Sequence, residues 1–320
     1  MSEKISYKSP WWLPTAHLQT IYPYFFLKGN PAKYQRERLN TQDGDFIDFD
    51  WLNGPSNSPI IIVFHGLEGS SKSHYVNAIM QHIKQLNWRG VSPNFRGCSG
   101  TNNNLARAYH SGDHNDIDLM IKHVRNKTTG PIFTVGVSLG GNALLKWLSI
   151  KSYKPKKSIR ASASISTPFN LMTTGDLLEK GVNKVYSRHF LKTLKTKCVE
   201  KLKILPDNFS LEKIMNATTL RDFDNNYTAP AHGYRDVNDY WTRASSITDL
   251  NNIDSPTLLI HSKNDPFLPK PHLPNSNFLP DNILCLYTDG GGHVGFTSGN
   301  FPGNLSWLPN TLFNYFKQFL

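Results

Sequence analysis

The chain has 320 residues, of which 38% are hydrophobic and 12% aromatic, so it is long enough for one large domain with a substantial core. Only 18% of the residues are charged, a proportion too low for an intrinsically disordered chain. The formal net charge is +11, but no nucleic-acid-binding module accompanies it, and we expect no nucleic-acid partner.

The N-terminal segment, residues 1–26, is rich in aromatic side chains and carries Pro10, Pro14 and Pro23. These prolines argue against one continuous amphipathic helix, so we expect the aromatic side chains to pack on the domain, with contact to a membrane interface as the alternative. The segment has no apolar signal-peptide core, and no stretch of the chain reaches about 18 apolar residues. Together with three widely spaced cysteines, this predicts a cytoplasmic protein without a membrane span or a disulfide framework.

The elements that follow predict an α/β fold. Residues 36–52 indicate a hairpin around Asp43 and Gly44, which would supply antiparallel edge strands. After it, apolar runs alternate with stretches of helical periodicity, a pattern typical of a mostly parallel central sheet with helices on both faces. The predicted strands are residues 59–66, 90–95, 131–138, 161–167, 256–262 and 283–289, and the predicted helices are residues 73–88, 114–126, 140–150 and 306–320.

This alternation lapses in residues 169–255, which have mostly helical patterns and many Lys and Asn residues. We predict a helical cap insertion there, within a single domain that spans residues 1–320. Its stretch 180–213 holds much of the positive charge, on Lys184, Arg188, Lys192, Lys195, Lys197, Lys201 and Lys203. A solvated helical face is the simplest interpretation, and attraction to an anionic membrane or acyl substrate is the alternative.

The sequence Gly136-Val137-Ser138-Leu139-Gly140 fits the pattern G-x-S-x-G, at the end of a predicted buried strand and the start of a helix. A sharp strand-to-helix turn crowds the backbone, so glycines are needed two residues on either side of the serine, whose Oγ then stands above the sheet. The N-terminus of the following helix offers N–H groups where an oxyanion would develop. We predict that Ser138 is a nucleophile; a plain glycine turn is the alternative.

A serine hydroxyl needs a base to take its proton and a third group to orient that base. In sheets of this kind the acid follows a late strand and the histidine follows the last one. Asp265 comes just after the predicted strand 256–262, and His293, in the stretch DGGGHVGF, comes just after the strand 283–289. The chain order Ser138, Asp265, His293 therefore predicts a catalytic triad.

Three other residues compete for these roles. Asp289 follows a strand but lies only four residues from His293, and Asp254 precedes its strand, at the opposite end of the sheet. His261 lies within a predicted strand and is expected to face the interior. His261 and Asp265 also spell HxxxD, a motif of another acyltransferase superfamily, but the second signature of that superfamily, DFGWG, is absent.

The segment HGLEG, residues 65–69, follows the first predicted buried strand, where folds of this kind place an oxyanion loop. We predict the backbone N–H of Leu67 as one oxyanion donor and that of Leu139, directly after the serine, as the other. An ordinary glycine exit from the strand is the alternative for HGLEG.

Histidines and acids also gather in YHSGDHND, residues 109–116, and these residue types can ligate a metal. The cluster precedes a predicted helix, where acids cap free N–H groups and favour the helix dipole, so capping is the simpler interpretation. Neither a phosphate-binding glycine loop nor a cysteine pair at metal spacing occurs. We expect no metal and no cofactor.

Over nearly its whole length the chain resembles the YheT-like branch of the α/β-hydrolases, also called the AB-hydrolase-4 group. The likeness rests on HLQTI (17–21), HGLEGSSKSHY (65–75), NFRGCSG (94–100), YHSGD (109–113), GVSLGGN (136–142), HGYRDVNDYW (232–241), NDPFLP (264–269) and GGGHVGF (290–296). The resemblance implies the α/β-hydrolase fold, with the family's triad at Ser138, Asp265 and His293. Trp241 stands where the family usually has tyrosine.

The family includes bacterial esterases, animal ABHD1/ABHD3-type lipid hydrolases and yeast ethyl-ester synthases. Residues and resemblance together predict a serine esterase that hydrolyses carboxylic esters of short, medium or lipid acyl chains. The nearest alternative uses the same triad to transfer an acyl group from a thioester to an alcohol. A non-catalytic protein that binds membrane surfaces through the basic segment is a rival from another class, and the intact triad argues against it.

Overall fold

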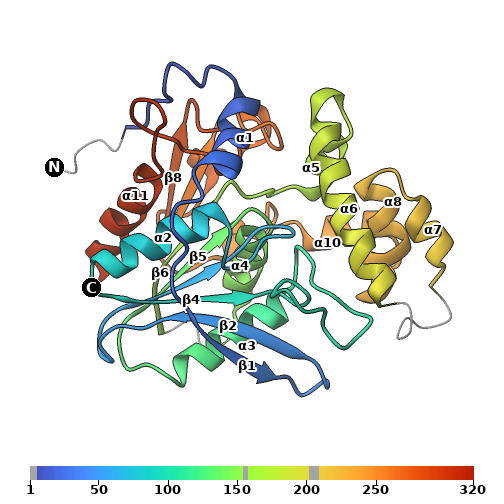
Figure 1. Ribbon diagram of the computed structural model, residues 1–320, viewed down its shortest axis with the longest axis horizontal. Helices are drawn as coiled ribbons and strands as arrows, with labels where there is room; N and C mark the ends of the chain where they lie inside the picture. Colours follow the sequence, from blue (N-terminus) through green and yellow to red (C-terminus); the bar gives the residue numbers. More distant parts are fainter. Residues whose placement is uncertain (1–5, 154–157, 202–208) are drawn as a thin grey trace.

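The computed structural model describes residues 6–153, 158–201 and 209–320, and its centre is an eight-stranded sheet (Figure 1). The strand order is β1-β2-β4-β3-β5-β6-β7-β8, and the pairs β1·β2 and β2·β4 are antiparallel whereas the other pairs are parallel. This confirms the mostly parallel sheet with antiparallel N-terminal edge strands. The strands are β1 (Gln35–Asn40), β2 (Phe46–Leu52), β3 (Ile60–Phe64), β4 (Arg89–Asn94), β5 (Ile132–Val137), β6 (Ile159–Ile165), β7 (Thr257–Ser262) and β8 (Ile283–Thr288).

Helices cover both faces of this sheet. Successive side chains of a strand point to opposite faces, so Ile60, Ile62 and Phe64 of β3 pack with α3 (His114–Arg125) and α4 (Leu139–Ser149). Ile61 and Val63 pack on the other face with α2 (His74–Gln85) and α11 (Trp307–Phe316). Because both faces are covered, the central strands read as continuous apolar runs rather than as alternating patterns.

The segment after β6 is helical and has small apolar clusters of its own (Figure 1). It contains α5 (Leu171–Leu178), α6 (Lys184–Glu200), α7 (Leu211–Asn216), α8 (Leu220–Phe223), the π-helical stretch η3 (Asp224–Thr228), α9 (Ala229–Ala231) and α10 (Val237–Ala244). In Figure 1 most of these helices stand beside the sheet, around the ends of its parallel strands. Short 3-10 turns complete the described chain: η2 (Gly181–Asn183), η4 (Leu250–Asn252), η5 (Lys270–His272), η6 (Ser276–Phe278) and η7 (Lys317–Phe319).

The basic side chains of α6 do not share one solvated face, contrary to expectation. Lys184, Arg188 and Lys192 are exposed, as predicted. Lys197 instead turns inward, and Lys201, just after α6, is buried with its ammonium bound to backbone carbonyls of Leu105 and Arg107. The long alkyl stem of lysine allows this, because it packs in the core while the ammonium reaches acceptors. Lys203 lies outside the described residues.

Within residues 6–26 the N-terminal segment is not one continuous helix, as expected, because α1 (Ala16–Phe26) begins only after Pro10 and Pro14; Pro23, however, lies inside this helix. Pro23 has no N–H to donate to the carbonyl of Gln19, one turn earlier. Gly295 packs against that carbonyl so closely that an added Cβ would lie 1.9 Å from the oxygen. The carbonyl that proline leaves without a helix donor thus lies against a glycine of the opposing loop, where a side chain would not fit.

α1 packs on the domain through buried Gln19 and Pro23, but much of its apolar surface stays exposed. The exposed side chains in and before it are Trp11, Leu18, Tyr24, Phe25 and Phe26. Among the described residues, no helix combines the length and the apolar character needed to cross a membrane.

Candidate active site

Ser138 sits at the sharp turn between β5 and α4. Its φ is 52° and its ψ is −119°, a conformation that non-glycine residues rarely adopt. A Cβ added at Gly136 would lie 2.6 Å from the carbonyl oxygen of Gly140, and one added at Gly140 would lie 2.4 Å from that of His65. Such close backbone approach is the physical reason for a glycine on either side of the serine.

A continuous line of hydrogen bonds joins the three residues of the predicted triad. His293 Nε2 lies 2.9 Å from Ser138 Oγ, and His293 Nδ1 lies 2.8 Å from Asp265 Oδ2. Asp265 is buried, and its other oxygen accepts the N–H of Phe267 at 2.8 Å. Since the carboxylate can only accept, Nδ1 carries the hydrogen and Nε2 is free to accept from the serine hydroxyl. The structure therefore brings together residues from the ends of β5, β7 and β8.

The competing residues lie in different surroundings. The Asp289 carboxylate is exposed and pairs with Lys263 Nζ at 2.6 Å, and Asp254 is exposed ahead of β7. His261 is buried, as expected, with Nε2 3.0 Å from the Leu268 carbonyl and 3.4 Å from Asp265 Oδ2. Burial lowers the pKa of His261, so this ring is neutral beside the carboxylate.

The segment HGLEG lies directly against the serine, because a Cβ added at Gly66 would be 3.1 Å from that of Ser138. The N–H groups on either side of Leu67 are both engaged: Gly66 N–H donates to Tyr75 Oη and Glu68 N–H to Tyr109 Oη, each at 2.8 Å. Leu139 is the first residue of α4, where an N–H has no acceptor within the helix. Leu67 and Leu139 both line a cavity that Ser138 also lines.

His65, at the start of HGLEG, ties this loop to the NFRG loop. Its Nε2 accepts the N–H of Phe95 at 3.0 Å, so Nδ1 carries the hydrogen and donates to the Gly66 carbonyl at 2.8 Å. Burial lowers its pKa to about 4, which keeps the ring neutral. His65 is therefore hydrogen-bonded to both loops and fixes their relative position.

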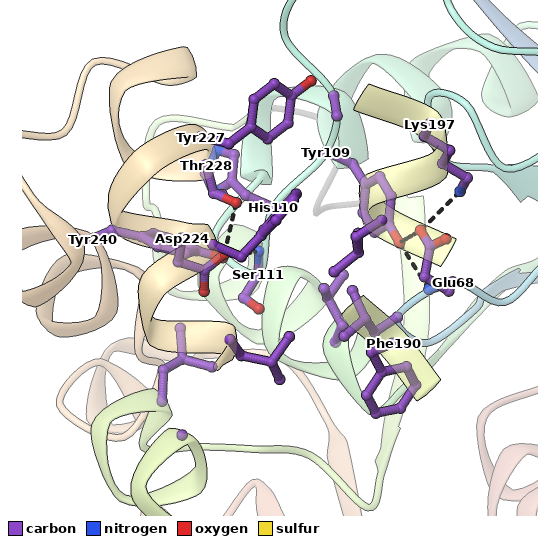
Figure 2. Close-up of a pocket in the computed structure, with 18 of the residues that line it drawn as sticks. Glu68, Tyr109, His110, Ser111, Phe190, Lys197, Asp224, Tyr227, Thr228 and Tyr240 are labelled. Atoms are coloured by element: carbon purple, nitrogen blue, oxygen red, sulfur yellow. Dashed lines mark hydrogen bonds and ion pairs between the residues drawn. The ribbon is translucent and has the colours of Figure 1, made fainter. Parts of the chain in front are cut away.

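Glu68 is a residue to which the sequence reasoning gave no role. Its φ is 54°, on the left-handed side that disfavours side chains, and its carboxylate is nearly buried. Oε1 accepts from Tyr109 Oη at 2.9 Å and pairs with Lys197 Nζ of α6 at 2.7 Å (Figure 2). We call these three side chains the Glu68 brace. It links the loop next to Ser138 to the helical segment.

Gln19 and Thr20 of α1 were also missed, although the motif HLQTI contains both. Gln19 Oε1 accepts from Gly291 N–H at 2.8 Å and from Asn264 Nδ2 at 3.0 Å. Thr20 Oγ1 accepts the N–H of His293 at 2.9 Å. α1 therefore holds both the loop that carries His293 and the loop that carries Asp265.

Two cavities meet at Ser138 and His293. The first, about 130 Å³, runs under the helical segment and is lined largely by apolar side chains, including Leu171, Leu178, Phe190, Leu194 and Phe223. The second, about 280 Å³, lies between α1, the start of α2 and α6, and its lining includes Tyr24, Phe25, Val185 and Tyr186. A reacting group at Ser138 thus has an apolar compartment on either side.

The acids and His114 of the cluster 109–116 make contacts that stabilise the start of α3 and the loops around it. Asp113 caps α3 and pairs with Arg107 at 3.0 Å, and Asp116 pairs with buried Arg96 at 2.7 Å. His114 Nδ1 bonds to Tyr153 Oη at 2.6 Å. Across the described ranges, no group of three or more His, Cys, Asp or Glu side chains is arranged to hold a metal ion. The capping interpretation rests on Asp113, whose side chain accepts the N–H of Asp116 at the start of α3.

Comparison with known proteins relates the chain to hydrolases. A family profile described as "alpha/beta hydrolase fold" matches residues 59–299. The Escherichia coli protein named "Putative esterase YheT" is 35% identical over 95% of this chain and 91% of its own length. "Phospholipase ABHD3" of Bos taurus is 29% identical over 97% of this chain and 76% of its own.

Two further comparisons agree with these. A yeast (Saccharomyces cerevisiae) "Monoacylglycerol lipase" is 27% identical over 84% of this chain and 61% of its own. Among solved structures, a Pyrococcus furiosus esterase shares the fold with a TM-score of 0.58, at 17% identity, over 89% of this chain and 91% of that one.

Proposed function

The chain belongs to the α/β-hydrolase family and is a hydrolase, and from that premise we propose that it is a serine carboxylesterase whose triad is Ser138, His293 and Asp265. The observation that carries the proposal is the line of hydrogen bonds from Asp265 through His293 to Ser138, at the junction of two cavities. Relatives named as esterase, phospholipase and monoacylglycerol lipase support esters with acyl chains as the substrate class.

In this mechanism Ser138 Oγ attacks the ester carbonyl while His293 Nε2 takes its proton. The N–H groups of Leu67 and Leu139 bind the oxyanion of the tetrahedral intermediate. His293 then protonates the leaving alcohol, and an acyl-enzyme remains on Ser138. Water, deprotonated by His293, releases the acid and restores the serine. Asp265 keeps the imidazole in the tautomer that both steps need.

We further propose that residues 169–255 form a cap over the acyl pocket, in line with the sequence prediction. Side chains of α5, α6 and η3 line the first cavity together with Ser138. The second cavity, which α1 and α6 border, would hold the alcohol part of the ester. An alcohol bound there would compete with water for the acyl-enzyme, so acyl transfer to an alcohol is the second candidate function.

A panel of p-nitrophenyl esters from acetyl to palmitoyl tests the esterase proposal. We expect hydrolysis with an optimum set by the apolar first cavity, and no loss of activity with EDTA. Adding ethanol and measuring the ratio of ethyl ester to free acid separates the two candidates: mainly acid supports hydrolysis, and mainly ethyl ester supports transfer. A protein that turns over no member of the panel would contradict both.

The contacts of the Glu68 brace predict that Lys197 affects catalysis through the oxyanion loop. Lys197→Met removes the cation that holds the Glu68 carboxylate, so the loop relaxes and the Leu67 N–H loses its alignment. We expect kcat to fall roughly tenfold with little change in KM, less than the loss of a whole oxyanion donor. Kinetics with a soluble ester, alongside the thermal unfolding midpoint, measure this.

Lys192→Met is the matched control, because Lys192 is an exposed lysine of the same helix. Its kcat should stay within about twofold of wild type. The double variant Glu68→Gln, Lys197→Met removes both charges and should recover part of the lost kcat. If Lys197→Met and Lys192→Met have the same kcat, the brace has no role in alignment.

A further inference from the structure

The first cavity has a polar wall that the proposed mechanism does not use. Asp224, Thr174 and Tyr240 line it, and Figure 2 shows Asp224 and Tyr240 on the side of the cavity opposite the Glu68 brace. The lining of the same cavity also includes Ser138 and the apolar side chains of Leu171 and Leu178. A largely apolar cavity that holds a few polar side chains on one wall is suited to orient a ligand with one polar end.

The Asp224 carboxylate can accept more hydrogen bonds than the protein donates to it. Its two oxygens accept from Thr228 Oγ1 at 2.6 Å and from Trp241 Nε1 at 2.8 Å, both neutral donors. A carboxylate offers about four acceptor positions, so unused ones remain. Burial raises the pKa of Asp224 to about 6. Asp224 also begins a π-helical stretch, a distortion that is common at functional sites.

The other two side chains add complementary groups. Thr174 is buried, and its hydroxyl has no hydrogen-bond partner within the described part of the chain. Tyr240 Oη accepts the N–H of Ser111 at 3.0 Å, which leaves its own hydrogen to be donated. An unpartnered buried hydroxyl is costly and unusual, so a ligand that pairs with it would be stabilised.

We propose that this wall binds a hydroxyl group carried by the acyl chain, so that terminally hydroxylated acyl esters are favoured substrates; the inference rests on the proposed esterase function. A hydroxyl donates one hydrogen, to Asp224, and accepts from Tyr240 or Thr174, so it matches both kinds of group. An ammonium ion would only donate and would leave the hydroxyl hydrogens of the wall without an acceptor. A methyl terminus would leave the Thr174 hydroxyl, the Tyr240 hydrogen and the spare acceptor positions of Asp224 unpaired.

The test compares p-nitrophenyl esters that differ only by OH or CH3 at the end of chains of equal length, from six to twelve atoms. At the chain length that reaches the wall, we expect kcat/KM for the hydroxylated ester to exceed that of its methyl isostere by about tenfold. The ratio at shorter lengths should favour the methyl ester, because a hydroxyl that ends beside apolar side chains such as Leu171 and Leu178 has no partner there.

The variant Asp224→Asn tests whether this wall causes the preference for the hydroxylated ester. The asparagine can keep both contacts, accepting from Trp241 and donating to Thr228, so the unfolding midpoint should change little. The ratio of kcat/KM for the hydroxylated ester to kcat/KM for its methyl isostere should fall to within about twofold of unity. Thr174→Val, a change of nearly equal volume, should lower it several-fold and serves if Asp224→Asn does not fold. Asp176→Asn is the control, since this exposed carboxylate of α5 pairs with Arg221, and it should keep the wild-type ratio.

Two results would overturn the inference alone: hydroxylated esters that are never favoured at any length, or a preference that survives in both Asp224→Asn and Thr174→Val. Either leaves the esterase proposal intact, because the methyl esters are still hydrolysed. Failure of wild-type protein on every ester would instead overturn the proposed function and this inference with it.

Discussion

Ser138→Ala should lower kcat/KM for p-nitrophenyl esters by roughly 10^4- to 10^6-fold. The change removes the atom that attacks the carbonyl and leaves water as the only nucleophile. The fold should be unaffected, because the Ser138 side chain makes no capping hydrogen bond to α4. Steady-state kinetics and circular dichroism measure the two effects separately.

Labelling with a fluorophosphonate gives a readout that does not depend on substrate choice. Wild type should take up one label per chain, on the peptide that contains Ser138, and Ser138→Ala should take up none. Ser246→Ala is the matched control, since this serine is buried, its N–H donates to Asn142 of α4, and its hydroxyl has no partner among the described residues. It should keep turnover within about twofold. Wild-type turnover or labelling in Ser138→Ala would refute the nucleophile.

Asp265→Asn should lower kcat by roughly 10^4-fold with little change in KM. The amide oxygen would keep accepting the N–H of Phe267, which turns the amide NH2 toward His293 Nδ1. Nδ1 must then accept, so the hydrogen moves to Nε2, and the ring can no longer take the proton of Ser138. The loss follows from the wrong tautomer, with the geometry nearly unchanged.

Asp289→Asn is the matched control for this variant. Asp289 lies four residues from His293 but is exposed and paired with Lys263, so its removal should leave kcat within about twofold. Stopped-flow measurement of the acyl-enzyme burst shows whether acylation is the step that slows. If Asp289→Asn were the impaired variant and Asp265→Asn were active, the orienting acid would be misassigned.

The fold was predictable from the sequence because its signals are local. Apolar runs such as residues 59–66 and helical periodicity such as residues 73–88 depend on neighbouring residues alone, and β3 and α2 lie within these ranges. The three residues of the predicted triad also follow from local patterns, since each was expected at the end of a strand, and the structure places them within hydrogen-bond distance.

What the sequence could not reveal depends on contacts between distant residues. Nothing in the pattern of α6 distinguishes Lys197 from its exposed neighbours; only packing against the loop of Glu68 does so. The packing of α1 around Pro23 likewise involves Gly295, which is far away in the chain. The motif HLQTI pointed to Gln19 and Thr20 but could not say which groups they bind.

The contacts of α1 also bear on the order in which the molecule becomes active during synthesis. Gln19 and Gly291 are 272 positions apart in the chain, yet they share a hydrogen bond. Closing so long a loop is entropically costly and slow, so these contacts form late in folding. α1 is synthesised first, but these contacts can form only after β8 and the loop that follows it have been synthesised. A nascent chain that lacks β8 also lacks His293, so under the proposed mechanism it has no base for ester hydrolysis until synthesis is nearly complete.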